Sequence, residues 1–218
     1  LLSYLLLATS LKSNETHQFS YEKVRGLILV QASLNDEAEK PFILDTGSDE
    51  IILHSKNYLE QAHKSDFITI TGEVQTQSAT TPSIRINDLI LRNREVFLGD
   101  LSALHHFLNR EIAGILGLGV FDNKSIFFDL QNQTITIGEK GKTINYNGTV
   151  TFPLNKLNGL PVLQLSINSV NTNFVLDSGC SAHVMDDSFA SAHFSSDQSL
   201  QSVRLIGLAA DKTLKHKK

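Results

Sequence analysis

The stretch Phe42-Ile43-Leu44-Asp45-Thr46-Gly47-Ser48 returns in altered form as Phe174-Val175-Leu176-Asp177-Ser178-Gly179-Cys180. Each copy has three apolar residues, followed by an Asp, a small hydroxyl residue and a Gly. One copy alone would indicate a buried strand that runs into a turn. Two copies indicate a duplicated unit that brings two carboxyl groups together, and paired carboxyl groups are suited to acid–base hydrolysis.

The similarity extends to both sides of these stretches. Gln31–Asn35 precedes the first Asp much as Gln164–Asn168 precedes the second, and Ile68–Gly72 is echoed by Val203–Gly207. A duplication of this length predicts two lobes related by a pseudo-twofold axis. The two Asp residues would then meet near that axis.

Composition excludes several classes of function. A chain of 218 residues can bury a sizeable core, and its net charge of −4 offers no basic footprint for nucleic acid. The single cysteine, Cys180, excludes an internal disulfide framework. The eight His residues are scattered without the spacing of metal ligands. We therefore expect no nucleic-acid partner, no metal and no cofactor.

The apolar pattern predicts an all-β protein with few short helices, because many short strands are separated by turn signals. Helices are expected only at Lys56–Ala62, after the capping residue Ser55, and at Leu101–Leu108. The predicted strands are Val24–Leu34, Phe42–Asp45, Phe67–Thr71, Ser78–Ile86, Leu89–Leu98, Ile126–Leu130 and Thr134–Ile137.

Four segments follow from this pattern. Residues 20–140 form the expected first lobe, residues 141–148 a linker rich in Gly, Lys and Asn, and residues 149–218 the second lobe. Residues 1–13 begin with an apolar run that is too short to span a bilayer and is typical of the end of a secretory signal peptide. This interpretation predicts a secreted or periplasmic protein, and the alternative is an apolar N-terminal strand.

The two Asp loops resemble those of the pepsin/retropepsin group of aspartic proteases. The segment Ala113–Gly119 supports the resemblance, because Ile115, Leu116 and Gly117 match the apolar-apolar-Gly element that follows the flap in that family. The resemblance covers about residues 22–210. It implies a two-lobed acid protease fold with lobes of retropepsin size, in which the apolar pair passes behind the Asp loop.

The resemblance implies that Asp45 and Asp177 form the catalytic dyad. Two carboxyl groups about 3 Å apart hold one proton between them, and the pair activates a water molecule for attack on a peptide carbonyl. It further implies that Thr46 and Ser178 exchange hydroxyl-to-backbone hydrogen bonds across the axis, and that Ser48 donates to its carboxylate. The residues expected to support the dyad are Thr46, Gly47, Ser48, Ser178, Gly179 and Cys180.

Three features depart from the family pattern. The candidate flap, Gly72, Glu73 and Val74 in the turn Gly72–Gln77, has no Tyr. Cys180 stands where the family often has Ser, Thr or Ala, and because a thiol is only a weak donor we expect Asp177 to be the protonated partner. The second apolar-apolar-Gly element would fall beyond Lys218, so we interpret the sequence as a fragment of a longer protein with an incomplete second lobe.

The sequence thus predicts an aspartic endopeptidase that binds an extended peptide or protein substrate and is monomeric at full length. Three alternatives stay open. The chain could be a catalytically silent pepsin-like module that binds peptides or partner proteins, or a duplicated β-protein in which Asp45 and Asp177 are only turn residues. One complete lobe could also pair with a second copy of itself, as in retroviral enzymes.

Overall fold

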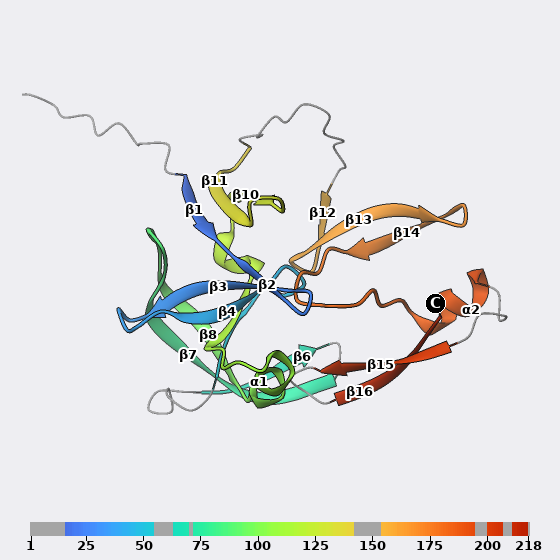
Figure 1. Ribbon diagram of the computed structural model, residues 1–218, viewed down its shortest axis with the longest axis horizontal. Coiled ribbons are helices and arrows are strands. Elements are labelled where there is room, and N and C mark those ends of the chain that lie inside the picture. Colours follow the sequence, from blue (N-terminus) through green and yellow to red (C-terminus); the bar gives the residue numbers. More distant parts are fainter. Residues whose placement is uncertain are drawn as a thin grey trace, which may run out of the picture.

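The all-β class is confirmed: in the computed structural model the chain is mostly β-strand, with two short α-helices among the described residues (Figure 1). The described residues are 16–54, 63–69, 72–141, 154–194, 200–206 and 211–217. The expected signal segment 1–13, the helix Lys56–Ala62 and nearly all of the linker 141–148 lie outside them. We call residues 16–141 the first half and residues 154–217 the second half.

The first half is built on an eight-stranded sheet in the order β2-β3-β4-β9-β5-β8-β7-β6. An additional antiparallel pairing of β3 with β7 makes this sheet fold back on itself. Its strands are β2 (Glu22–Val24), β3 (Leu27–Leu34), β4 (Lys40–Asp45), β5 (Ile51–His54), β6 (His63–Thr69), β7 (Gly72–Ile86), β8 (Leu89–Gly99) and β9 (Gly114–Gly117).

Strand β9 is the central element of this sheet. It runs parallel to β4, with Asp45 opposite Gly117, and antiparallel to β5. All four of its residues are buried. The sequence-predicted element Ile115-Leu116-Gly117 therefore lies directly beside the strand that ends in Asp45.

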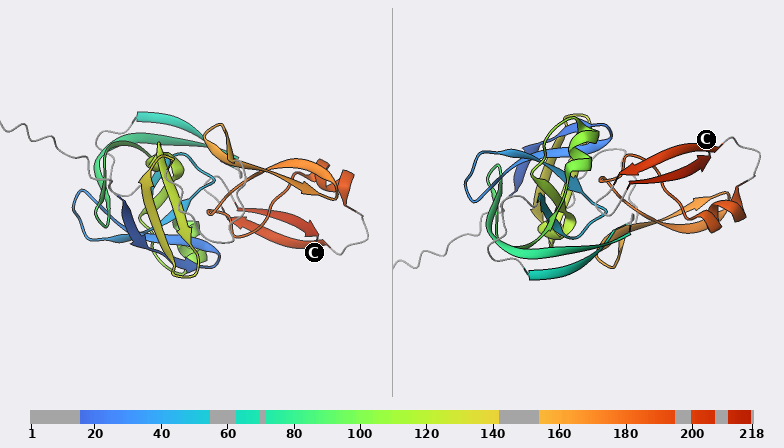
Figure 2. Two further views of the ribbon diagram at one scale, coloured as in Figure 1. Left: turned by 90° about the horizontal axis from the view of Figure 1, so that it is seen from above. Right: turned by 90° about the horizontal axis from the view of Figure 1, so that it is seen from below.

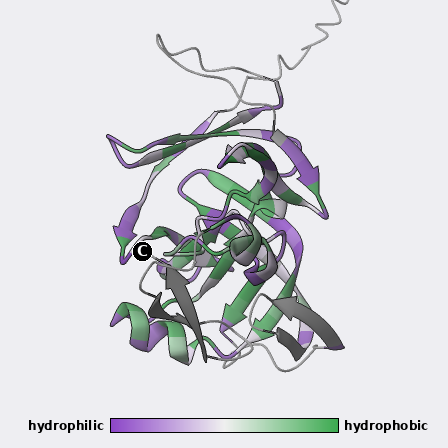
Figure 3. Ribbon diagram, turned by 90° about the vertical axis from the view of Figure 1, so that its right-hand side faces the viewer, coloured by the Kyte–Doolittle hydropathy of each residue, from purple (hydrophilic) through white to green (hydrophobic). Residues whose placement is uncertain are grey.

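The two faces of the sheet pack into two separate apolar clusters. Phe42 and Leu44 belong to the larger cluster, whereas Ile43 between them belongs to the smaller one, as the two-residue period of a strand requires. Helix α1 (Ser102–Leu108) covers the smaller cluster with Leu104 and Leu108. This helix confirms the prediction for Leu101–Leu108. Apolar residues accordingly dominate the central strands in Figure 3.

A three-stranded sheet in the order β1-β11-β10 packs on the larger cluster through Phe19, Ile135 and Ile137. The hairpin of β10 and β11 agrees with the sequence prediction, although β11 extends to Glu139, two residues beyond the predicted end of this strand. The strands are β1 (His17–Ser20), β10 (Lys124–Asp129) and β11 (Thr134–Glu139), and the 3-10 helix η3 (Leu118–Phe121) connects β9 to β10.

The second half lies beside the first half in all three views (Figures 1 and 2). It contains a three-stranded sheet in the order β12-β13-β14, a helix and a separate hairpin of β15 and β16. Its elements are β12 (Leu154–Leu157), β13 (Leu160–Ile167), β14 (Val170–Val175), α2 (Asp187–His193), β15 (Leu200–Ile206) and β16 (Asp211–Lys217).

The duplicated stretches adopt similar strands in very different surroundings. Ile43 and Leu44 are 3% and 0% exposed between β3 and β9, whereas their counterparts Val175 and Leu176 are 46% and 51% exposed. Among the described residues, β14 pairs only with β13. The second half therefore gives its Asp loop much less packing support.

The predicted boundaries of the flap hairpin were wrong. Residues Gly72–Gln77 were expected to form its turn, but they are the start of the long strand β7, and Thr69 pairs with Gly72. Strands β6 and β7 do pair as antiparallel neighbours, and residues 70–71 between them lie outside the described residues. No helix in the described part of the chain is long and apolar enough to cross a membrane.

Candidate active site

Two loops from the two halves meet at the candidate site. Asp45 is the last residue of β4 and is half-buried, whereas Asp177 follows β14 by two residues and is exposed. The carboxyl group of each Asp lies against the glycine of the other loop, and the charge of Asp177 acts on Asp45. The structure thus brings together the two carboxyl groups that the duplicated sequence singled out.

Four reciprocal hydrogen bonds join the loops. Thr46 Oγ1 donates to the carbonyl oxygen of Leu176 over 2.6 Å, and Ser178 Oγ donates to that of Leu44 over 2.8 Å. The backbone N–H of Thr46 donates to Ser178 Oγ over 3.0 Å, and that of Ser178 donates to Thr46 Oγ1 over 2.9 Å. Each hydroxyl group therefore donates once and accepts once, which is the exchange that the resemblance implied.

Gly47 and Gly179 stand where no side chain fits. A Cβ atom on Gly47 would lie 2.5 Å from the carboxyl carbon of Asp177, and one on Gly179 would lie 2.3 Å from that of Asp45. Each glycine also donates its backbone N–H to the carboxylate of its own loop over 2.8 Å. The two glycines are thus required because each loop packs its backbone against the carboxyl group of the other.

The environment of the dyad favours a protonated Asp45. Burial, the negative charge of Asp177 and the hydrogen bond between the two side chains together raise the pKa of Asp45 to about 7, although the backbone N–H groups of Gly47 and Gly179 act in the opposite direction. Asp45 is also the more buried of the two residues. This assignment is opposite to the sequence-based expectation that Asp177 carries the shared proton.

Two expected supporting contacts are absent from the site. Ser48 Oγ donates to Glu50 Oε2 over 3.3 Å and not to Asp45, so the prediction for Ser48 was wrong. The thiol of Cys180 donates to the carbonyl oxygen of Ala182 over 3.0 Å. Burial raises the pKa of this thiol, and the negative charges of Asp177 and Asp45 raise it further.

Sequence reasoning missed two carboxylates next to the first loop. Glu50 accepts from the backbone N–H of Asp49 over 3.2 Å as well as from Ser48, and so organises the end of this loop. Asp49 has a buried Oδ1 with no hydrogen-bond partner in the described part of the chain. Asp49 and Glu50 directly follow Asp45-Thr46-Gly47-Ser48, and this position could have marked them as candidates. The sequence did not show which way either side chain points.

The candidate flap residues Gly72, Glu73 and Val74 lie at the tip of the β6–β7 hairpin. Their backbone is strand, and their side chains are outside the described part of the structure. Within the described residues, no group of three or more His, Cys, Asp or Glu side chains could hold a metal ion.

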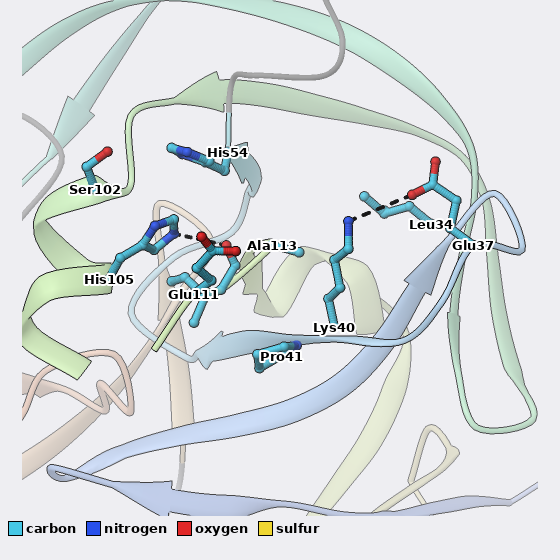
Figure 4. A pocket seen from close by; sticks show the side chains of 10 residues that line it. Leu34, Glu37, Lys40, Pro41, His54, Ser102, His105, Glu111 and Ala113 are labelled. Carbon is cyan, nitrogen blue, oxygen red and sulfur yellow. Dashed lines mark hydrogen bonds and ion pairs between the residues drawn. The ribbon is translucent and has the colours of Figure 1, made fainter. Parts of the chain in front are cut away.

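A cavity of about 410 Å³ lies at the far end of β4 from the dyad (Figure 4). Lys40, the first residue of β4, lines it together with His54 and His105, whose rings are 4.7 Å apart. His54 Nδ1 accepts from the backbone N–H of Leu101, and His105 Nε2 contacts the carbonyl oxygen of Ile112 over 3.0 Å. Both rings are therefore engaged in holding α1 and the segment before β9 in place.

Comparisons with protein-family models and with characterised proteins found no match to this chain.

Proposed function

We propose that this protein is an aspartic endopeptidase with a two-lobed, pepsin/retropepsin-like fold. Residues 20–140 would form the first lobe, residues 149–218 would form part of the second, and residues 141–148 would link them. The observation that carries the proposal is the reciprocal arrangement of the two loops, in which each Asp faces the glycine of the other loop. A pair of surface turns would have no need of such an arrangement.

In the proposed mechanism the dyad holds one proton, and water provides the nucleophile. The ionised carboxyl group, Asp177, removes a proton from a water molecule placed between the two side chains. As this water attacks the peptide carbonyl carbon, protonated Asp45 donates its proton to the carbonyl oxygen. The tetrahedral intermediate collapses when Asp177 gives the proton that it took from water to the nitrogen of the scissile bond, Asp45 takes a proton from a hydroxyl group of the intermediate, and the C–N bond breaks. Neither a metal ion nor a covalent intermediate takes part.

The substrate would be an extended peptide in the cleft between the lobes. Strand-like main-chain hydrogen bonds are the usual way in which such a segment is held beside a sheet. The β6–β7 hairpin is the proposed flap over this cleft. We further propose that the protein acts as a monomer outside the cytoplasm, in keeping with the apolar segment at residues 1–13.

The pH dependence of activity follows from the dyad. The singly protonated pair is lost when Asp45 ionises, so the rate should fall as the pH rises through about 7. The test is cleavage of a peptide library between pH 4 and pH 8, with and without a pepstatin-type inhibitor. The proposal predicts inhibitor-sensitive cleavage that disappears in both Asp45→Asn and Asp177→Asn. Cleavage that survives these substitutions would refute it.

A catalytically silent peptide-binding module is the second candidate. The observations that favour it are the 46% and 51% exposure of Val175 and Leu176, since a loop without packing behind it holds its carboxylate less firmly. The same library distinguishes the two candidates. Saturable peptide binding without any turnover, unchanged in Asp45→Asn, would support the silent module.

A further inference from the structure

Two tight turns occupy equivalent places in the two halves. Arg25 and Gly26 connect β2 to β3, and Asn158 and Gly159 connect β12 to β13. Both turns have two successive residues with positive φ, 49° and 91° in the first turn and 50° and 82° in the second. This conformation is that of a two-residue hairpin turn, which is compact and stiff.

Each turn touches the Asp loop of the other half. A Cβ atom on Gly26 would lie 3.1 Å from Cβ of Ser181, and one on Gly159 would lie 3.0 Å from the carboxyl carbon of Asp49. Ser181 is the fourth residue after Asp177, and Asp49 is the fourth residue after Asp45. The two contacts are therefore reciprocal, in the same way as the hydroxyl exchange nearer the dyad.

Side-chain contacts at or next to each turn also hold it in place. The guanidinium carbon of Arg25 lies 5.3 Å from the ring centroid of Phe107 on α1. Near the second turn, Lys156 Nζ forms an ion pair with Asp122 Oδ1 over 3.2 Å, which ties β12 to the end of η3 in the first half. A turn that is anchored and stiff can resist movement of the loop that it touches.

We propose that the turns Arg25–Gly26 and Asn158–Gly159 act as reciprocal spacers between the halves and set the separation of Asp45 and Asp177. Gly26 and Gly159 are thus positioning residues that act through Ser181 and Asp49. A methyl group at either glycine would meet the opposite loop at a distance that is shorter than ordinary van der Waals contact. The loop would move away, and its Asp would move with it.

The titration of Asp45 reports this separation. Asp177 and the thiol of Cys180 are the groups that interact with Asp45 electrostatically from the second half, and Glu50 lies in the same loop as Asp45. The charge of Asp177 and its hydrogen bond both raise the pKa of Asp45. When the carboxyl groups move apart, both effects weaken and this pKa falls toward its ordinary value.

The experiment compares three variants, Gly26→Ala, Gly159→Ala and Gly141→Ala. Gly141 is the matched control, because its φ of +84° strains an Ala in the same way while its Cβ would meet no atom within 4 Å. Carboxyl carbon NMR of isotopically labelled protein gives the pKa of Asp45 in each variant, and thermal unfolding gives the Tm.

We expect all three substitutions to lower the Tm, and only Gly26→Ala and Gly159→Ala to lower the pKa of Asp45, by about 0.5 unit or more. An unchanged pKa in these two variants, or an equal shift in Gly141→Ala, would overturn the proposal. Any effect of this separation on peptide cleavage rests on the proposed function. The titration needs no substrate, so the spacer role can be supported even if no peptide is cleaved.

Discussion

The raised pKa of Asp45 makes the stability of the protein depend on pH in an unusual direction. A carboxyl group that binds its proton more tightly in the folded state stabilises that state at low pH, and the stabilisation is lost as the pH rises. A pKa of about 7 in place of 3.8 corresponds to about 4 kcal/mol, all of which is lost between about pH 4 and pH 7. We treat this value as an upper limit, because the proton is shared with Asp177.

Asp45→Asn should remove this dependence. The amide oxygen of Asn can still accept the hydrogen bond from the backbone N–H of Gly47, whereas no charge is buried at high pH. We therefore expect the variant to be more stable than the wild type at pH 8, by as much as about 4 kcal/mol, and nearly equal to it at pH 4. Urea unfolding at half-unit pH intervals measures the difference.

Asp177→Asn provides the matched comparison. It removes the neighbouring charge but leaves Asp45 buried, and burial is the largest cause of the raised pKa. This variant should keep a substantial part of the pH dependence. Parallel stability curves for the wild type and Asp45→Asn between pH 4 and pH 8 would show that the reasoning about Asp45 is wrong.

Three further predictions concern the neighbourhood of the dyad. Thr46→Val and Ser178→Ala should each lower the free energy of unfolding by about 1–3 kcal/mol, because each leaves partly buried backbone groups unpaired. The loss in the double variant should be smaller than the sum of the two single losses. Equal losses in urea unfolding for Thr80→Val, on an exposed position of β7, would contradict the role of the exchange. Cys180 should react with a disulfide reagent more slowly at pH 8 than free cysteine does, since its pKa is raised; a rate equal to that of free cysteine would count against this. Asp186→Ala should weaken helix α2, because Asp186 caps it by accepting from the N–H groups of Ser188 and Phe189. Unchanged backbone chemical shifts across Asp187–His193 would be the contrary result.

Much of the site was predictable because it is local and repeated. An apolar run that ends in Asp predicts a strand and a loop, and a second copy of the run implies that the two loops meet. These inferences depend on residues whose roles are set by their immediate neighbours in the sequence. The place of Ile115-Leu116-Gly117 behind the Asp loop was expected only from the family resemblance, and β9 pairs in parallel with β4.

The errors arose where the decisive contact is distant or depends on side-chain orientation. Ser48 bonds to Glu50, a choice between two nearby carboxylates that the sequence leaves open. The proton is assigned to Asp45 because burial is the largest cause of its raised pKa, and burial is a property of the whole fold. The turn at Gly72 was misplaced because polar residues such as Glu73 and Gln75 belong to the long strand β7, where composition does not distinguish strand from loop.

One edge of β14 has no strand beside it within the described residues, which has a consequence for the dynamics of the protein. Strand β4 is held on both sides by β3 and β9, whereas β14 has only β13 beside it among the described residues. Backbone amides that face solvent along such an edge exchange with deuterium after small local openings. In a hydrogen–deuterium exchange experiment we expect Val170–Val175 to exchange orders of magnitude faster than Lys40–Asp45, so that Asp177 would lose its backbone support long before Asp45 does.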